Sequence, residues 1–118
     1  MVLTRRAMLA AMACGAAGLA LPAAAAPGNA RALIAAARRQ VGVTLHYDPA
    51  YSRIPFPNGD VPRAKGVCTD VLIRAYRDAL ALDLQALLNA DMRAHFSAYP
   101  RSWGLRTTDR NIDHRRVP

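Results

Sequence analysis

The chain has 118 residues, two cysteines and a formal net charge of +8. This length excludes several sizeable domains, and a domain so small buries only about 60–65% of its unfolded surface, so its core must be thin. With one exception the basic residues are arginines, and all acidic residues are aspartates. Such a surface could attract an anionic envelope polymer, lipid headgroups or nucleic acid. The arginines are scattered and do not alternate with aromatic residues, which argues against nucleic acid.

The start of the chain has the layout of an export signal. Arg5 and Arg6 form a positive segment, an apolar run follows, and small residues precede a cut that we place after Ala25. The paired arginines resemble a twin-arginine signal, and the apolar run is shorter than the roughly 20 residues that span a bilayer. We therefore expect residues 1–25 to be a signal peptide and residues 26–118 to be a single periplasmic domain that meets the membrane only during export. Secretion and a lipid or helical anchor are the alternatives.

Three helices and one short strand are predicted in the mature chain. Helical spacing of apolar residues predicts helices over 30–41, about 68–80 and about 83–96, while residues 43–47 form a short β-prone run. Residues 48–65 contain four prolines and an Asn-Gly turn pair, so we expect a long loop. Loops of that length in small domains are often functional.

Each predicted helix should bury one apolar face. The expected inward residues are Leu33, Ile34, Ala37 and Val41 in the first helix; Val71, Leu72, Ala75, Tyr76, Ala79 and Leu80 in the second; and Leu84, Leu87, Leu88, Met92, His95 and Phe96 in the third. A single strand has no partner in this inventory. The pattern indicates the front of an α+β domain, mostly α with one or two short strands, and we expect the chain to be truncated at its C-terminus.

Cys68 is the most informative residue. Because Cys14 lies in the leader, Cys68 should be the only cysteine of the mature chain. It is predicted at a helix start, where free backbone N–H groups and the helix dipole favour the nucleophilic thiolate. An unpaired cysteine in an exported protein is either a reactive thiol or a buried, inert side chain, and the local pattern leaves both open.

A cysteine hydrolase also needs an imidazole base, a group that orients it and donors for the oxyanion. His46 and His114 are the candidate bases, although a structural role is the simpler interpretation of each. Two arginines follow His114 and should lower its pKa by like charge. His95 is expected to have a hydrogen-bonded packing role. Asp60 and Asp70 could orient the imidazole, but Asp70 is more simply an acid that stabilises a helix start.

Substrate contacts are expected in and beside the long loop, from Tyr47, Asp48, Tyr51 and Asp60. We expect no cofactor. A metal site is not expected either, because the cysteine and the histidines lack paired ligand spacing.

Five segments carry a family resemblance when they are taken together. They lie at residues 41–51, 59–62, 66–71, 91–93 and 111–117. In combination they resemble the bacterial DUF1287 family, which is thought to be similar to the NlpC/P60 and papain-like cysteine peptidases. Members of that group place a cysteine at the start of a helix packed on an antiparallel sheet, and a histidine from the sheet activates it. The resemblance implies that Cys68 is the nucleophile and that a strand beyond Val117, absent from this sequence, would carry the base.

The function that we expect is an exported papain-like thiol hydrolase acting on peptide or amide bonds of the cell envelope, inactive if truncation has removed its base. Its partner would be a cell-wall peptide or an anionic envelope polymer. One alternative is a non-catalytic envelope-binding module whose loop residues Tyr47, Tyr51 and Phe56 contact the ligand. The other is a fragment with no function of its own.

Overall fold

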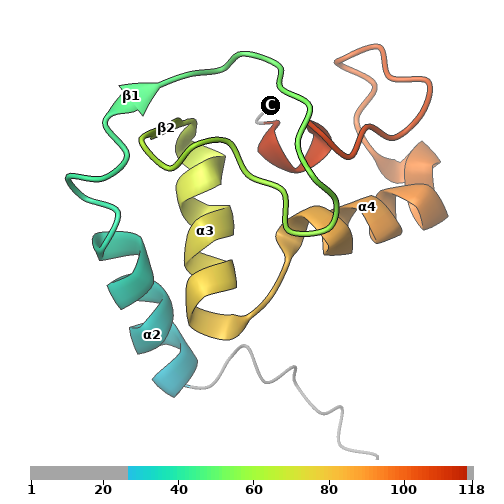
Figure 1. The fold of residues 1–118 in the computed structure, drawn as a ribbon. Coiled ribbons are helices and arrows are strands. Elements are labelled where there is room, and N and C mark those ends of the chain that lie inside the picture. Colours follow the sequence, from blue (N-terminus) through green and yellow to red (C-terminus); the bar gives the residue numbers. More distant parts are fainter. Residues whose placement is uncertain (1–26, 117–118) are drawn as a thin grey trace, which may run out of the picture.

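The computed structural model describes residues 27–116, so the predicted signal peptide lies outside the described residues. Over that range the fold consists of helices, one pair of very short strands and 3₁₀ turns (Figure 1). In chain order they are α2 (Pro27–Arg38), β1 (His46–Tyr47), β2 (Lys65–Gly66), α3 (Cys68–Leu80), α4 (Leu84–His95), η2 (Phe96–Ala98) and η3 (Asp113–Arg115). The arrangement confirms a small α+β domain that is mostly α. Within residues 27–116, no helix has the length and apolar character needed to cross a membrane.

The helices form two unequal units. Figure 1 shows α2 and α3 side by side and antiparallel, with α4 lying crosswise to the right of α3. The loop after β1 passes over to α4 and returns to β2, so it joins the two units. Few apolar residues in the described range are buried: Ala36, Val61, Ile73, Ala75 and Met92. The core is therefore thin, as the chain length predicts.

The predicted strand does have a partner. β1 pairs with β2 in parallel, with His46 opposite Lys65 and Tyr47 opposite Gly66. The Asp48 N–H donates to the Gly66 carbonyl oxygen at 3.0 Å and extends the pairing by one residue. The expectation of an unpartnered strand was wrong because Lys65 and Gly66, at the end of the proline loop, carry no β pattern of their own.

The predicted inward face of the first helix was wrong at two of its four residues, since Leu33 and Ala37 are half-buried but Ile34 and Val41 are not. Ile34 is 52% exposed and Val41 is 83% exposed, whereas Ala36 and Gln40 are buried. The helix ends at Arg38, three residues earlier than predicted, so Val41 lies in the turn that follows. The Gln40 side chain donates to the Val71 carbonyl oxygen of α3 at 2.8 Å, which fixes the face that packs.

Three further residues that we expected to be inward are exposed. Leu72 is 51% exposed, Leu87 is 54% exposed, and His95 lies on the open side of α4. His95 still forms the expected hydrogen bond, from Nδ1 to Asp91 Oδ1 at 3.2 Å. The two later helices have broad apolar stripes, and each packs against neighbours along only part of its stripe.

Buried polar side chains hold the long loop where the apolar core is too small to do so. Arg74 is fully buried on α3 and binds Asp60 through Nε and Nη2 at 2.8 and 2.9 Å. Gln85 on α4 is 1% exposed; it accepts from the Gly59 N–H and donates to the carbonyl oxygens of Pro55 and Arg110. Burying such groups is tolerable because hydrogen bonds satisfy them.

Candidate functional site

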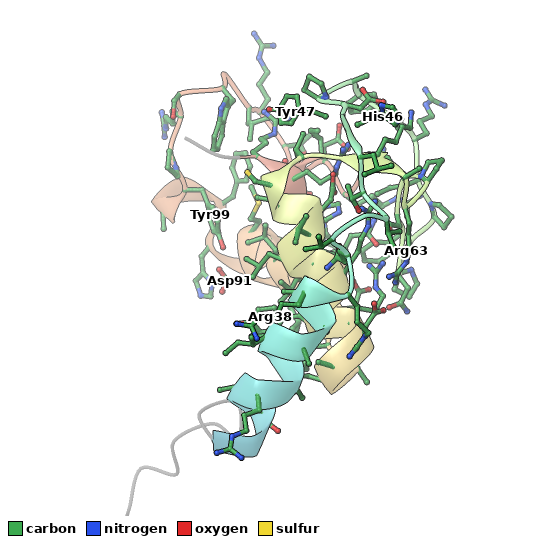
Figure 2. All side chains as sticks on the ribbon, turned by 90° about the vertical axis from the view of Figure 1, so that its left-hand side faces the viewer. Arg38, His46, Tyr47, Arg63, Asp91 and Tyr99 are labelled. Atoms are coloured by element: carbon green, nitrogen blue, oxygen red, sulfur yellow. The ribbon has the colours of Figure 1, made fainter. Side chains whose placement is uncertain are left out.

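Cys68 is exposed at the first residue of α3, which excludes the buried, inert alternative. Its side chain borders two shallow cavities of about 340 and 280 Å³. Tyr47 and Val67 line both of them. His46 and Tyr47 lie near the end of the molecule at which α3 begins (Figure 2). The parallel strand pair thus brings β1 next to the helix start.

The backbone at this helix start offers hydrogen-bond donors. Val67 is the N-cap residue, and its N–H donates to Asp70 Oδ2 at 2.7 Å. Within residues 27–116 the N–H groups of Cys68 and Thr69 have no acceptor. Free N–H groups at a helix start attract negative charge. An oxyanion formed beside the Cys68 sulfur could therefore accept from them.

Asp70 is held by Arg115, a partner that the sequence did not predict. It is 3% exposed, and its two carboxylate oxygens accept from Arg115 Nε at 2.8 Å and Nη2 at 2.9 Å. This hydrogen bonding raises the pKa of Arg115 above its usual value. The pair neutralises the Asp70 charge that would otherwise oppose a thiolate at Cys68. It also occupies both oxygens of Asp70, so this carboxylate is not available to orient an imidazole.

Thr69, the second residue of α3, does not cap the helix. Its hydroxyl donates to the Arg115 carbonyl oxygen at 3.0 Å, which adds a second tie between α3 and η3. Asp70, which was predicted to stabilise the helix start, does so from the third helical position. The predicted beginning of α4 is confirmed, since Asp83 caps it by accepting from the Gln85 N–H at 3.1 Å.

Gly66 makes this packing possible. Its φ is +154°, and a Cβ built there would lie 2.7 Å from Asp70 Oδ2. A side chain at this position would therefore displace the Asp70 carboxylate, which accepts hydrogen bonds from the Val67 N–H and the Arg115 guanidinium. The site requires glycine for space and for backbone geometry.

The two candidate bases occupy different environments. His46 is exposed on β1 and lines the same 280 Å³ cavity as Cys68. His114 is only 9% exposed in η3, and burial lowers its pKa, with a smaller contribution from the Arg115 charge. The predicted direction is confirmed, but burial and not like charge is the main cause. Among residues 27–116, the only histidine side chain with a hydrogen bond is that of His95.

The four predicted substrate-binding residues are distributed over separate parts of the domain. Tyr47 is 76% exposed and lines both Cys68 cavities. Asp48 pairs with Lys65 at 2.7 Å, and this hydrogen bond lowers its pKa. Asp60 is occupied by Arg74, on the other side of the loop. Tyr51 lines a third cavity, described below. The structure therefore brings Cys68, His46 and Tyr47 together and leaves Asp60 apart from them.

Three comparisons with known proteins bear on identity. The sequence model of one protein family, described as "Domain of unknown function (DUF1287)", matches residues 34–118. The chain is 55% identical over 82 residues to the uncharacterized protein YijF of Escherichia coli (strain K12). That match covers 70% of this chain and 40% of the relative, so the chain spans well under half of the relative's length. No solved structure matches.

Proposed function

This chain belongs to the DUF1287 family, and we propose that it is an exported papain-like thiol hydrolase for peptide or amide bonds of the cell envelope. The observation that carries the proposal is the exposed Cys68 sulfur at the first residue of α3, beside two backbone N–H groups that have no acceptor among residues 27–116. The remaining support is the predicted export signal and the family resemblance of the segment around the cysteine.

The proposed reaction has two steps. The Cys68 thiolate attacks the acyl carbon, the carbonyl electron pair moves onto oxygen, and the N–H groups of Cys68 and Thr69 donate to the resulting oxyanion. The C–N bond then breaks as the leaving amine takes a proton from an imidazolium. Water, deprotonated by the same imidazole, then hydrolyses the thioester and releases the acid and the thiol.

His46 is the better-supported base among the described histidines. It is exposed and shares a cavity with Cys68, whereas His114 is buried and borders neither of the two Cys68 cavities. The role of Tyr47 would be to form a wall of the substrate site, since it borders both cavities.

A second candidate function is a non-catalytic envelope-binding module. It is favoured by one observation: within residues 27–116 no hydrogen bond joins Cys68 to an imidazole. Such a module would bind a cell-wall peptide in the same cavities without cleaving it.

The test compares the reactivity of Cys68 with that of a matched thiol. We expect iodoacetamide at pH 7 to alkylate wild-type protein at least about tenfold faster than the double variant Cys68→Ser/Ser102→Cys, which moves the thiol to an exposed turn. His46→Gln should abolish release of amines from purified peptidoglycan. Equal alkylation rates would refute a nucleophilic Cys68. Fast alkylation with no amine release, but retained binding of peptidoglycan, would favour the binding module.

We also propose that residues 1–25 direct export to the periplasm. Replacement of both arginines, Arg5→Lys/Arg6→Lys, should retain the protein in the cytoplasmic fraction if a twin-arginine route is used. An unchanged periplasmic fraction would point to a general secretory route, and a cytoplasmic wild-type protein would contradict export.

A further inference from the structure

A cavity of about 610 Å³, here called the arginine cavity, lies between the proline loop, α4 and the segment before η3. It is lined by Tyr51, Arg53, Ile54, Phe56, Asn89, Arg93 and residues 107–111. Its volume falls within the range of small-ligand sites. Because its walls come from three separate parts of the chain, it is a feature of the fold and not of one helix surface.

The arginine cavity carries an excess of positive charge. Arg53, Arg93 and Arg110 reach it from three different segments, and each is exposed. Within the described part of the chain, none of the three lies within 4 Å of a carboxylate. Arg110 stacks over the Phe56 ring at 5.5 Å, which restrains its guanidinium.

Among the described lining residues Asp109 is the one acid, and its carboxylate already accepts hydrogen bonds. The Asp109 carboxylate accepts from the Tyr51 hydroxyl at 3.0 Å and from the Asn111 N–H at 2.9 Å. The Asn111 side chain donates to the Tyr51 oxygen at 3.0 Å and accepts from the Ile54 N–H at 3.1 Å. These bonds hold the wall between loop and tail in place. Asp109 keeps its negative charge because both donors are neutral, so the lining carries three positive charges against one negative charge.

The arginine cavity adjoins the site at Cys68. Pro49 lines the 340 Å³ cavity beside Cys68, and Tyr51 lines the arginine cavity two residues later. In the segment before η3, Ile112 lines the 340 Å³ cavity and the preceding residue, Asn111, lines the arginine cavity. Consecutive Cα atoms are about 3.8 Å apart, and two steps along the chain span at most about 7 Å. The two linings are thus within about 7 Å of each other along the backbone, a separation that an extended ligand of a few residues can span.

We propose that the arginine cavity binds carboxylate groups of an acidic peptide whose acyl bond lies at Cys68. The inference rests on the proposed hydrolase for the position of the acyl bond, but the binding itself does not depend on cleavage. Arginine binds carboxylates in a planar, often bidentate geometry. Three guanidiniums on separate segments fit separate carboxylates along a peptide.

A second group of arginines provides the contrast. Arg31, Arg38 and Arg39 border another shallow cavity, but all of its lining comes from α2 and the residue that follows it. That surface has no polar wall comparable with Tyr51 and Asn111. It serves as the matched control, since it carries the same charges without the built site.

The test measures binding of the peptide acetyl-Ala-Glu-Glu-Ala by titration calorimetry, with full-length protein carrying Cys68→Ser. We expect Arg53→Gln/Arg110→Gln to raise Kd at least about tenfold, Arg93→Gln alone to raise it several-fold, and the control Arg31→Gln/Arg38→Gln to leave it within about twofold. The Gln-containing analogue of the peptide should bind at least about tenfold more weakly than the Glu peptide.

The outcomes separate the subsite from the hydrolase. Equal losses in the two double variants, equal binding of the Gln analogue, or displacement of the peptide by equimolar inorganic phosphate would overturn the subsite. Arg93 is exposed on α4, so Arg93→Gln should leave the fold intact. This single variant keeps the test valid if the double variant does not fold. Slow alkylation of Cys68 together with Arg53-dependent binding would refute the hydrolase and retain the subsite.

Discussion

Removal of Arg115 should destabilise the domain far more than removal of a geometrically similar arginine on the surface. Arg115 and Asp70 form a two-point ion pair whose side chains are 2% and 4% exposed. Arg63 and Asp78 form an equally short two-point pair, at 2.8 and 2.7 Å, whose side chains are 47% and 30% exposed. Arg115→Met leaves a carboxylate buried beside the helix start, and Arg63→Met leaves one that water can solvate.

The magnitudes follow from that difference in exposure. Breaking a buried pair by removal of one partner costs about 3–5 kcal/mol, whereas an exposed pair contributes about 0–1 kcal/mol. For a domain of this size 1 kcal/mol corresponds to about 4–8 °C in Tm. We therefore expect Arg115→Met to lower Tm by about 12–40 °C or to prevent folding, and Arg63→Met to lower it by less than about 8 °C.

Urea unfolding followed by circular dichroism measures both effects. The double variant Asp70→Leu/Arg115→Met removes both charges and should recover a large part of the loss, because a buried pair replaced by apolar residues of similar size is often nearly neutral. If Arg115→Met and Arg63→Met cost the same, or if the double variant is worse than the single one, then the pair does not hold the domain as we reason.

Two further predictions concern the same region. Gly66→Ala should cost about 1–3 kcal/mol, because the new Cβ would meet Asp70 Oδ2 at 2.7 Å, while Gly28→Ala on α2 has nothing within 4 Å and should be neutral or slightly stabilising; thermal unfolding of both decides this. Burial lowers the pKa of His114 below 6.5, so the unfolded chain binds its proton first and stability falls as pH drops through about 6.5. The urea midpoint should therefore fall more between pH 7.5 and 5.5 in the wild-type protein than in His114→Asn, and parallel changes in the two proteins would contradict a buried neutral imidazole.

The sequence predicted an element correctly where the residues that determine its structure lie within the same segment. The predicted bounds of α3 and α4 agree with the structure to within one residue, because the apolar spacing that predicts each helix lies within its own segment. The long loop was predictable from its prolines. The exposure of Cys68 could not be decided locally, and neither could the pairing of Lys65–Gly66 with β1, because two residues carry no periodicity.

The sequence did not predict the buried roles of Arg115, Arg74 and Gln85, because these roles depend on contacts between segments that are far apart in the chain. Arg115 meets Asp70 across 45 positions, and Arg74 is buried within an apolar stripe only because Asp60 lies opposite. A sequence shows arginine as a surface residue on average. Only the pairing with a carboxylate makes its burial possible, and that pairing has no signature in spacing. The same holds for Gln85, whose three hydrogen bonds go to two different segments.

The environment of Cys68 is therefore controlled by residues that do not touch the sulfur. Asp70 receives the Val67 N–H at the helix start, occupies the space that Gly66 leaves, and binds Arg115 of η3. Because one carboxylate makes all three contacts, the position of η3 and the geometry of the helix start are coupled. The apolar core is too thin to fix the two units independently, so we infer that this buried ion pair, and not the core, determines how the tail is placed against the thiol.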